Sequence, residues 1–164
     1  MKIIDMRSDT QTKPTDEMIQ AMAEADMGDD TLRESASVNR LEEMSAEIMG
    51  KEAALFVAST TMGNVLAVLT HCNRGDEVIM GSQAHMFRNE QNGAAILAGA
   101  QTVLVPNDIR GIMEPADVAA AIRPKGNSPF PSTGLFCMEN THTSCNGAVI
   151  GPDHTKEIAD LAHA

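Results

Sequence analysis

After residue 50 the sequence alternates between short apolar runs and amphipathic segments, and this alternation limits the folds open to the chain. The predicted strands span residues 53–57, 77–80, 101–105 and 135–138. The predicted helices follow them over residues 62–70, 89–98 and 115–122, and from about residue 153. Successive strand–helix units favour a parallel sheet with helices on both faces. We therefore expect an α/β fold of three layers, α/β/α, with a mainly parallel sheet.

Residues 1–50 lack this alternation and predict a helical segment. Pro14 and Thr15 open a first helix, which the glycine and two aspartates at 28–30 interrupt. In a second helix, Val38, Leu41 and Ile48 are spaced for one buried face, and Gly50 ends it. We expect an N-terminal helical segment over residues 1–50 and the first part of an incomplete α/β domain over 51–164.

The balance of charge and apolar residues excludes several classes of partner. Twelve Lys and Arg face 23 Asp and Glu, for a formal net charge of −11. This charge repels polyanions, so we expect neither nucleic acid nor an anionic membrane as a partner. No apolar run approaches the roughly 18 residues of a membrane span, and no charged-then-apolar leader precedes Ile3. Three cysteines in no framework spacing predict free thiols, and we expect a cytoplasmic protein.

The turn over residues 58–64 joins the first predicted strand to its helix and carries hydroxyl side chains. The first N–H groups of a helix lack intrahelical acceptors and lie at the positive end of its dipole. Thr60 and Thr61 could add two hydroxyl donors to a phosphate held there. The alternative is an ordinary helix cap, with Thr61 accepting from an N–H group. The turn alone leaves both interpretations open.

Two of the four predicted strand ends carry a histidine. His85 follows the second strand and His142 follows the fourth. Ligands of parallel sheets bind at the carboxyl ends of the strands, although a lone histidine is more often structural. The chain has no Trp and no Tyr, so only histidine is expected to stack on a flat bound ring. Glu139 is a candidate partner for His142 or for backbone N–H groups.

Other motifs point to no competing chemistry. The sequence contains neither the glycine pattern of dinucleotide-binding turns nor that of the phosphate-binding P-loop. His142 and Cys145, with Cys137 and His154 as possible additions, fit no zinc spacing, and we expect no metal site. A nucleophilic Cys145 beside His142 stays an alternative, although nothing nearby favours a thiolate.

Several strings occur in an order typical of one enzyme family. They are Asp5-Met6-Arg7-Ser8-Asp9-Thr10, Thr12-Lys13-Pro14-Thr15, Gly28-Asp29-Asp30, Val38-Asn39-Arg40-Leu41-Glu42, Gly50-Lys51-Glu52-Ala53-Ala54-Leu55-Phe56, Thr61-Met62-Gly63-Asn64, Gly75-Asp76-Glu77-Val78-Ile79, Ala84-His85 and Glu139-Asn140-Thr141-His142. With them the chain resembles, nearly end to end, the amino-terminal part of the low-specificity L-threonine aldolases. These are pyridoxal-phosphate lyases of fold type I, the aspartate-aminotransferase fold.

The resemblance implies roles for five residues and a reaction. Thr60 and Thr61 would hold the phosphate of pyridoxal 5′-phosphate, and His85 would stack on its pyridine ring. His142 would lie near the substrate hydroxyl and help remove its proton, and Ser8 would help to fix the substrate carboxylate. The implied reaction cleaves a β-hydroxy-α-amino acid, such as L-threonine or L-allo-threonine, to glycine and an aldehyde. The complete family protein is expected to be a homo-oligomer, a dimer or a tetramer.

The chain departs from the family pattern in two ways. Thr60, Leu32-Arg33, Asn89 and Asn146 stand where members usually carry other residues. The family's Schiff-base lysine, pyridinium aspartate and carboxylate-binding arginines correspond to positions beyond 164, and the five lysines here match none of them. In the family's sheet order, 3-2-4-5-6-7-1, the first strand pairs only with the seventh. We therefore expect the isolated chain to be an inactive fragment.

The sequence leaves three further functions open, two of them closer than the third. One is another amino-acid lyase of the same fold, because the cofactor-binding part is shared. The second is a non-catalytic, truncated paralogue that serves as a partner subunit. A plain anion-binding α/β domain is a more distant alternative.

Overall fold

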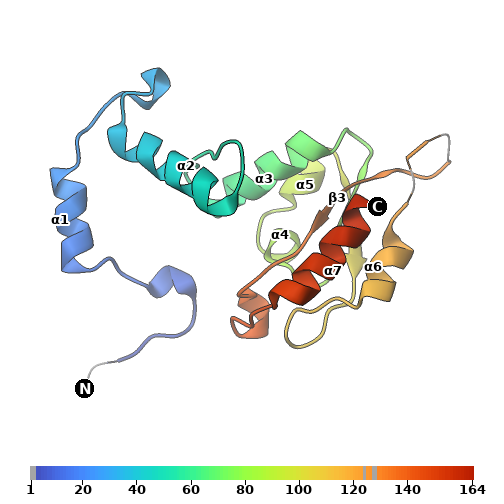
Figure 1. The fold of residues 1–164 in the computed structure, drawn as a ribbon. Coiled ribbons are helices and arrows are strands. Elements are labelled where there is room, and N and C mark those ends of the chain that lie inside the picture. Colours follow the sequence, from blue (N-terminus) through green and yellow to red (C-terminus); the bar gives the residue numbers. More distant parts are fainter. Residues whose placement is uncertain (1–2, 124, 127–128) are drawn as a thin grey trace. The chain divides into compact units, whose positions relative to one another are not determined.

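The computed structural model describes residues 3–123, 125–126 and 129–164, and its chain forms two compact units (Figure 1). The first unit is Met1–Ala58 and the second is Ser59–Ala164. The predicted division after residue 50 stays a prediction.

The described residues of the first unit form two α-helices and two short 3-10 helices. The α-helices are α1 (Asp16–Glu24) and α2 (Ala36–Met49), and the 3-10 helices are η1 (Asp9–Gln11) and η2 (Asp30–Leu32). Thr15 caps α1 by accepting from the Met18 N–H. Gly50 ends α2 in the left-handed region, with φ +61°. Both helices therefore begin and end near the predicted residues.

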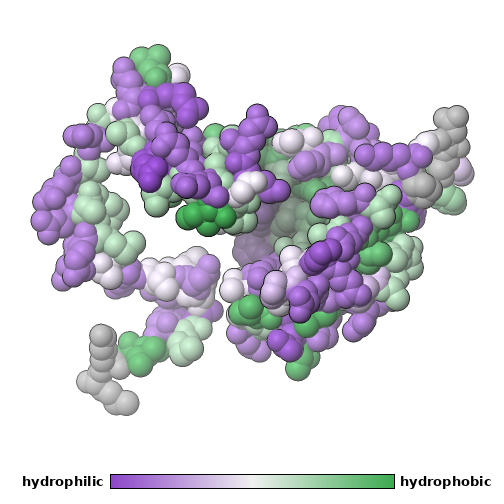
Figure 2. Space-filling model, viewed as in Figure 1, coloured by the Kyte–Doolittle hydropathy of each residue, from purple (hydrophilic) through white to green (hydrophobic). Residues whose placement is uncertain are grey.

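Two predictions for this unit are wrong. Residues 53–57 form no strand. A strand needs a hydrogen-bonded neighbour, and the described part of this unit offers none. The Phe56 N–H instead donates to a side chain, at Glu42 Oε1 (2.9 Å). The apolar side of α2 is also not buried: Leu41 is 48% and Ile48 76% exposed. Apolar side chains consequently lie on the surface of this unit (Figure 2).

The second unit is built on a parallel three-stranded sheet. Its strands are β1 (Glu77–Gly81), β2 (Gln101–Val105) and β3 (Thr133–Cys137), in the order β2-β1-β3. Both neighbours of β1 are parallel to it. If the predicted strand at 53–57 is numbered 1, then β1, β2 and β3 become strands 2, 3 and 4, and their order in the sheet is 3-2-4. The same order occurs within the sheet order expected from the family resemblance, 3-2-4-5-6-7-1. The expected α/β class with a parallel sheet is confirmed.

Helices cover both faces of this sheet, as expected for three layers (Figure 1). On one face, α3 (Thr60–His71) and α5 (Gly93–Ile96) pack on Val78 and Met80 of β1. On the other, α6 (Pro115–Ala121) and α7 (Pro152–His163) pack around Ile79. Successive residues of β1 thus enter opposite cores, which is why the strand reads as a continuous apolar run. No helix in the described part of the chain is long and apolar enough to cross a membrane.

The predicted helix over residues 89–98 is wrong as a continuous element. The structure has α4 (His85–Arg88) and α5 in its place, separated by a tight turn. Gln91 and Asn92 lie in the left-handed region in this turn, with φ 55° and 60°. A right-handed helix cannot continue through two such residues. Three other predictions agree with the structure to within one residue: the strand at 101–105 is β2, the helix at 115–122 is α6, and the helix starting at about 153 is α7.

Candidate functional site

The candidate site lies in the second unit, at the carboxyl ends of β1 and β3. After β1 the chain turns into α4, which begins with His85. After β3 it reaches Glu139 and then the 3-10 helix η3 (Thr143–Cys145), which His142 precedes. Because β1 and β3 are adjacent and parallel, these segments share one edge of the sheet. This is the edge at which parallel sheets bind ligands.

The first turn of α3 offers free hydrogen-bond donors. The first backbone bond of the helix runs from the Gly63 N–H to the Ser59 carbonyl (3.1 Å). Ser59, and not Thr61, is the N-cap: its Oγ accepts from the Met62 N–H (3.1 Å). The N–H groups of Thr60 and Thr61 precede the first intrahelical bond, and both residues are exposed. The capping role considered for Thr61 is therefore wrong, and its hydroxyl is not used as the cap.

His85 is held at its backbone and at its ring. Its N–H donates to Glu139 Oε2 (2.7 Å). Its Nδ1 lies 2.8 Å from Glu90 Oε1. The Glu90 side chain is 3% exposed, whereas the His85 side chain is 41% exposed. A half-exposed imidazole is thus fixed by a buried carboxylate.

The same carboxylate joins His85 to α3. The Asn64 Nδ2 donates to Glu90 Oε1 (2.8 Å), and Asn64 lies one helical turn after Thr60. Sequence reasoning did not single out Glu90. Its signal was weak: an acidic residue five positions after His85, inside a segment predicted as a continuous helix.

Glu139 connects the His85 segment to the His142 segment. Besides the His85 N–H, it accepts from the Thr143 N–H through Oε1 (2.9 Å). Of the two roles left open for Glu139, binding of backbone N–H groups is confirmed. His142 Nδ1 lies 3.6 Å from Glu139 Oε1, longer than a hydrogen bond, and has no hydrogen-bond partner within the described residues.

His142 is buried where a loop glycine meets its ring. The residue is 2% exposed. A Cβ added at Gly111 would meet His142 Cδ2 at 2.5 Å, and Gly111 has φ +80°. The backbone of His142 also pairs with Ala148, whose carbonyl accepts the His142 N–H (3.1 Å). His142 therefore sits at the predicted strand end, but inside the protein.

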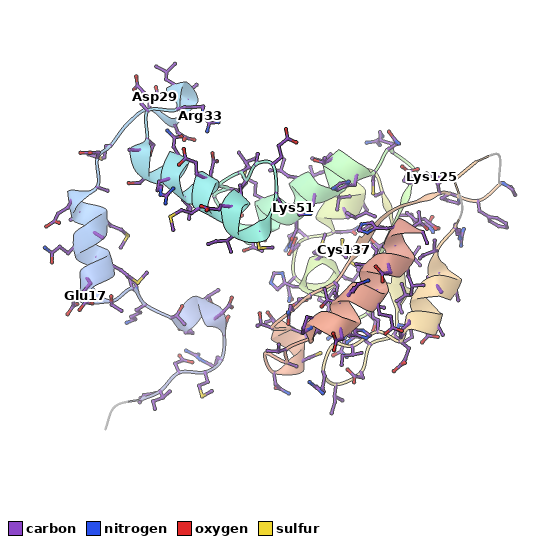
Figure 3. All side chains as sticks on the ribbon, in the orientation of Figure 1. Glu17, Asp29, Arg33, Lys51, Lys125 and Cys137 are labelled. Atoms are coloured by element: carbon purple, nitrogen blue, oxygen red, sulfur yellow. The ribbon has the colours of Figure 1, made fainter. Side chains whose placement is uncertain are left out.

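The thiols lack the features of nucleophiles. Burial, followed by the charges of Glu139 and Asp108, raises the pKa of Cys145. Cys137 lies on β3 (Figure 3). Burial raises the pKa of Cys137 to about 12 and, together with Asp76, raises the pKa of Cys72. A reactive cysteine needs a lowered pKa, so the structure does not support the alternative of a Cys145 nucleophile.

Ser8 lies in the first unit. Its Oγ accepts from the Thr10 N–H (3.3 Å) at the start of η1 and donates to Asp9 Oδ1 (3.0 Å). Its predicted contact with a substrate carboxylate stays a prediction, as do the predicted roles of Thr60, Thr61, His85 and His142.

A family model for beta-eliminating lyases matches residues 5–164. This chain belongs to the beta-eliminating lyase family. Among its relatives is low-specificity L-threonine aldolase 1 of Arabidopsis thaliana, 44% identical over 99% of the chain and 46% of the relative. The low specificity L-threonine aldolase of Escherichia coli K12 is 40% identical over 94% of the chain and 45% of the relative. The chain thus spans less than half the length of these curated relatives.

Proposed function

We propose that this chain supplies the first part of the cofactor site of a pyridoxal-phosphate-dependent threonine aldolase. The observation that carries the proposal is the link from the first turn of α3 to His85. Asn64 and His85 share one oxygen of Glu90, so the free donors of Thr60 and Thr61 and the half-exposed imidazole belong to one hydrogen-bonded unit. The names of the relatives, which are L-threonine aldolases, support the same reaction.

The residues present fit this cofactor. A phosphate requires several donors without a fixed acceptor, and the N–H groups and hydroxyls of Thr60 and Thr61 meet that requirement. A pyridine ring requires a flat partner, and His85 has 41% of its side chain exposed while its Nδ1 is bound to Glu90. Pyridoxal phosphate, when bound, would supply the electron sink for cleavage of the Cα–Cβ bond.

The chain's own residues would then position the substrate and move protons. Ser8 would bind the carboxylate of a β-hydroxy-α-amino acid of the L-threonine or L-allo-threonine type. His142 would accept the proton of its hydroxyl as glycine and an aldehyde form. Because His142 is 2% exposed, it can reach that hydroxyl only if the segments covering it move.

Three further properties belong to this proposal. A cytoplasmic location is supported by the free state of the three cysteines. A homo-oligomeric assembly is the expectation for the complete protein of this family. The 164-residue chain alone would not turn over, which is supported by its coverage of under half of its relatives.

Specific observations also support two alternatives to a threonine aldolase. The family model is that of beta-eliminating lyases, which favours another amino-acid lyase with the same cofactor site. The coverage of under half of each relative also suits a truncated, non-catalytic partner subunit. Co-purification of the chain with a full-length relative would favour the second alternative.

Comparison of pyridoxal phosphate with pyridoxal tests the proposed phosphate site. Equilibrium dialysis should show that the double variant Thr60→Val, Thr61→Val binds pyridoxal phosphate at least about tenfold more weakly, a loss of about 1.4 kcal/mol. Its affinity for pyridoxal, which has no phosphate, should not change. Thr70→Val is the matched control, since the Thr70 hydroxyl donates to the Leu66 carbonyl at the other end of α3. Equal weakening toward both ligands would refute the phosphate site.

A further inference from the structure

We propose that Glu90 is a positioning residue that fixes the proton and the ring plane of His85. In this role Glu90 keeps a proton on Nδ1 of the imidazole and fastens the ring to α3 through Asn64. The bonds themselves are properties of this chain alone. Only their purpose, which is to present the imidazole to a flat ligand, rests on the proposed function.

The hydrogen bonds assign the proton. An ionised carboxylate can only accept, and Glu90 Oε1 lies 2.8 Å from both His85 Nδ1 and Asn64 Nδ2. The imidazole must therefore donate from Nδ1, which in the neutral ring leaves the proton off Nε2. Asn64 supplies the second donor to the same oxygen.

Burial makes this arrangement specific. The Glu90 side chain is 3% exposed, and a buried carboxylate is costly unless it is hydrogen-bonded. An apolar residue would satisfy packing at this position, so packing alone does not account for Glu90. The carboxylate of Glu90 differs from an apolar side chain in accepting the hydrogen bonds of Asn64 and His85.

The turn after Glu90 is built to bring the carboxylate to α3. Gln91 and Asn92 occupy the left-handed region, which is uncommon for residues other than glycine. Gly93 then approaches α3 so closely that a Cβ there would meet Val65 Cγ2 at 2.9 Å. Backbone strain of this kind persists only where the surrounding structure enforces it.

The imidazole is consequently held at two points. Glu139 holds the backbone N–H of His85 (2.7 Å) and Glu90 holds its Nδ1 (2.8 Å). A ring fixed in this way loses little further rotational freedom when a ligand stacks on it, which increases affinity. Glu90 would thus act on the ligand through His85 and without touching it.

Nitrogen NMR of the full chain, labelled with ¹⁵N-histidine and free of cofactor, tests the assignment. In the native protein His85 should show a protonated Nδ1. Glu90→Leu should convert His85 to the mixture of tautomers of an unrestrained imidazole, while the other four histidines keep their signals. Glu157→Leu is the control, because it removes the partner of His154 in a looser pair (3.9 Å), in which the Glu157 side chain is 59% exposed. An unprotonated Nδ1 in the native protein, or an unchanged tautomer in Glu90→Leu, overturns the proposal.

A conservative variant keeps the test valid if Glu90→Leu does not fold. Glu90→Gln retains an acceptor oxygen but removes the charge, and charge-assisted hydrogen bonds are the stronger kind. The Nδ1 proton should therefore stay bound in Glu90→Gln but resonate upfield of its native position. An identical resonance in the native protein and in Glu90→Gln overturns the proposal.

Affinity for pyridoxal phosphate separates this inference from the proposed function. If the native chain binds the cofactor, Glu90→Leu should bind it at least fivefold more weakly and Glu90→Gln within twofold of the native chain. Equal affinity of all three proteins overturns the positioning role. If the native chain does not bind but its tautomer depends on Glu90 as described, the proposed function fails, and Glu90 still fixes the proton and ring plane of His85.

Discussion

Gly111 shows how a single missing side chain shapes the candidate site. Its φ of +80° disfavours any other residue, and a Cβ at this position would meet the His142 ring at 2.5 Å. Gly147 also has a positive φ, +69°, but no atom lies within 4 Å of a Cβ added there. The two glycines therefore separate backbone strain from steric overlap.

Alanine substitutions at these glycines should differ in cost. Gly147→Ala should lower the free energy of unfolding by about 1 kcal/mol, the penalty of a left-handed residue. Gly111→Ala should lower it by about 2–4 kcal/mol, because overpacking against His142 adds to that penalty. Urea unfolding of the two variants measures the difference. Equal costs would contradict the packing of Gly111 on His142.

Cys137 should make the free energy of unfolding fall as the pH rises through the alkaline range. Burial is the main cause that raises the pKa of this thiol from its ordinary value of 9.0 to about 12 in the folded chain, with Cys72 and Glu90 contributing. A folded pKa above the unfolded one means that the stabilisation is complete below pH 9 and is lost as the pH rises toward 12. The expected loss is about 1.4 kcal/mol for each pH unit.

Cys137→Ala should remove this part of the pH dependence. Urea unfolding should show a constant difference in stability between the native chain and Cys137→Ala up to pH 9. Between pH 9 and 12 the native chain should lose stability faster than the variant. Parallel curves over this range would contradict a buried, neutral Cys137.

Among residues, the sequence predicted those whose role is local and missed those whose role depends on distant partners. Thr15 marks the start of α1 and Gly50 marks the end of α2, and both could be predicted because capping needs only the adjacent turn. His85 and His142 could be assigned to strand ends from chain order alone. Glu90 could not be found in this way, since its importance lies in its bond to Asn64, 26 positions earlier.

At the scale of elements, α3 carries the donors of the proposed phosphate site, and Ser59 fixes where it begins. The Ser59 Oγ accepts from the Met62 N–H. Ser59→Ala should therefore lower the free energy of unfolding by about 1 kcal/mol, the usual value of an N-cap. Thr61→Ala, in the same turn but not the cap, should stay within about 0.5 kcal/mol of the native chain. Chemical unfolding followed by circular dichroism distinguishes the two, and reversed effects would contradict this cap.

Elements also differ in how well the sequence predicts them. The spans of β2 and α6 follow from apolar runs and a proline at the helix start, which are local signals. The break between α4 and α5 was missed, because Gln91 and Asn92 are not glycines and gave no sign of left-handed backbone. The segment 53–57 has the composition of a strand, but the described residues of its unit offer no neighbouring strand, and composition cannot supply one.

At the scale of the whole molecule, the strand order β2-β1-β3 agrees with the sheet of the resembled family, while the chain spans under half of its relatives. The proposed function therefore predicts cofactor recognition without turnover. Purified chain mixed with pyridoxal phosphate and L-threonine should release no aldehyde above the background of the free cofactor. After borohydride reduction, no lysine should carry a stoichiometric label. Stable labelling of one lysine would show that this chain holds a catalytic amine after all.

In the proposed function, the first turn of α3 and the imidazole of His85 form one site for pyridoxal phosphate. Titration of the ¹⁵N-labelled chain with pyridoxal phosphate, followed by NMR, tests this shared site. The amide signals of Thr60 and Thr61 and the ring signals of His85 should shift together, with a single dissociation constant. Shifts confined to other residues, or different dissociation constants for the threonines and the histidine, would contradict it.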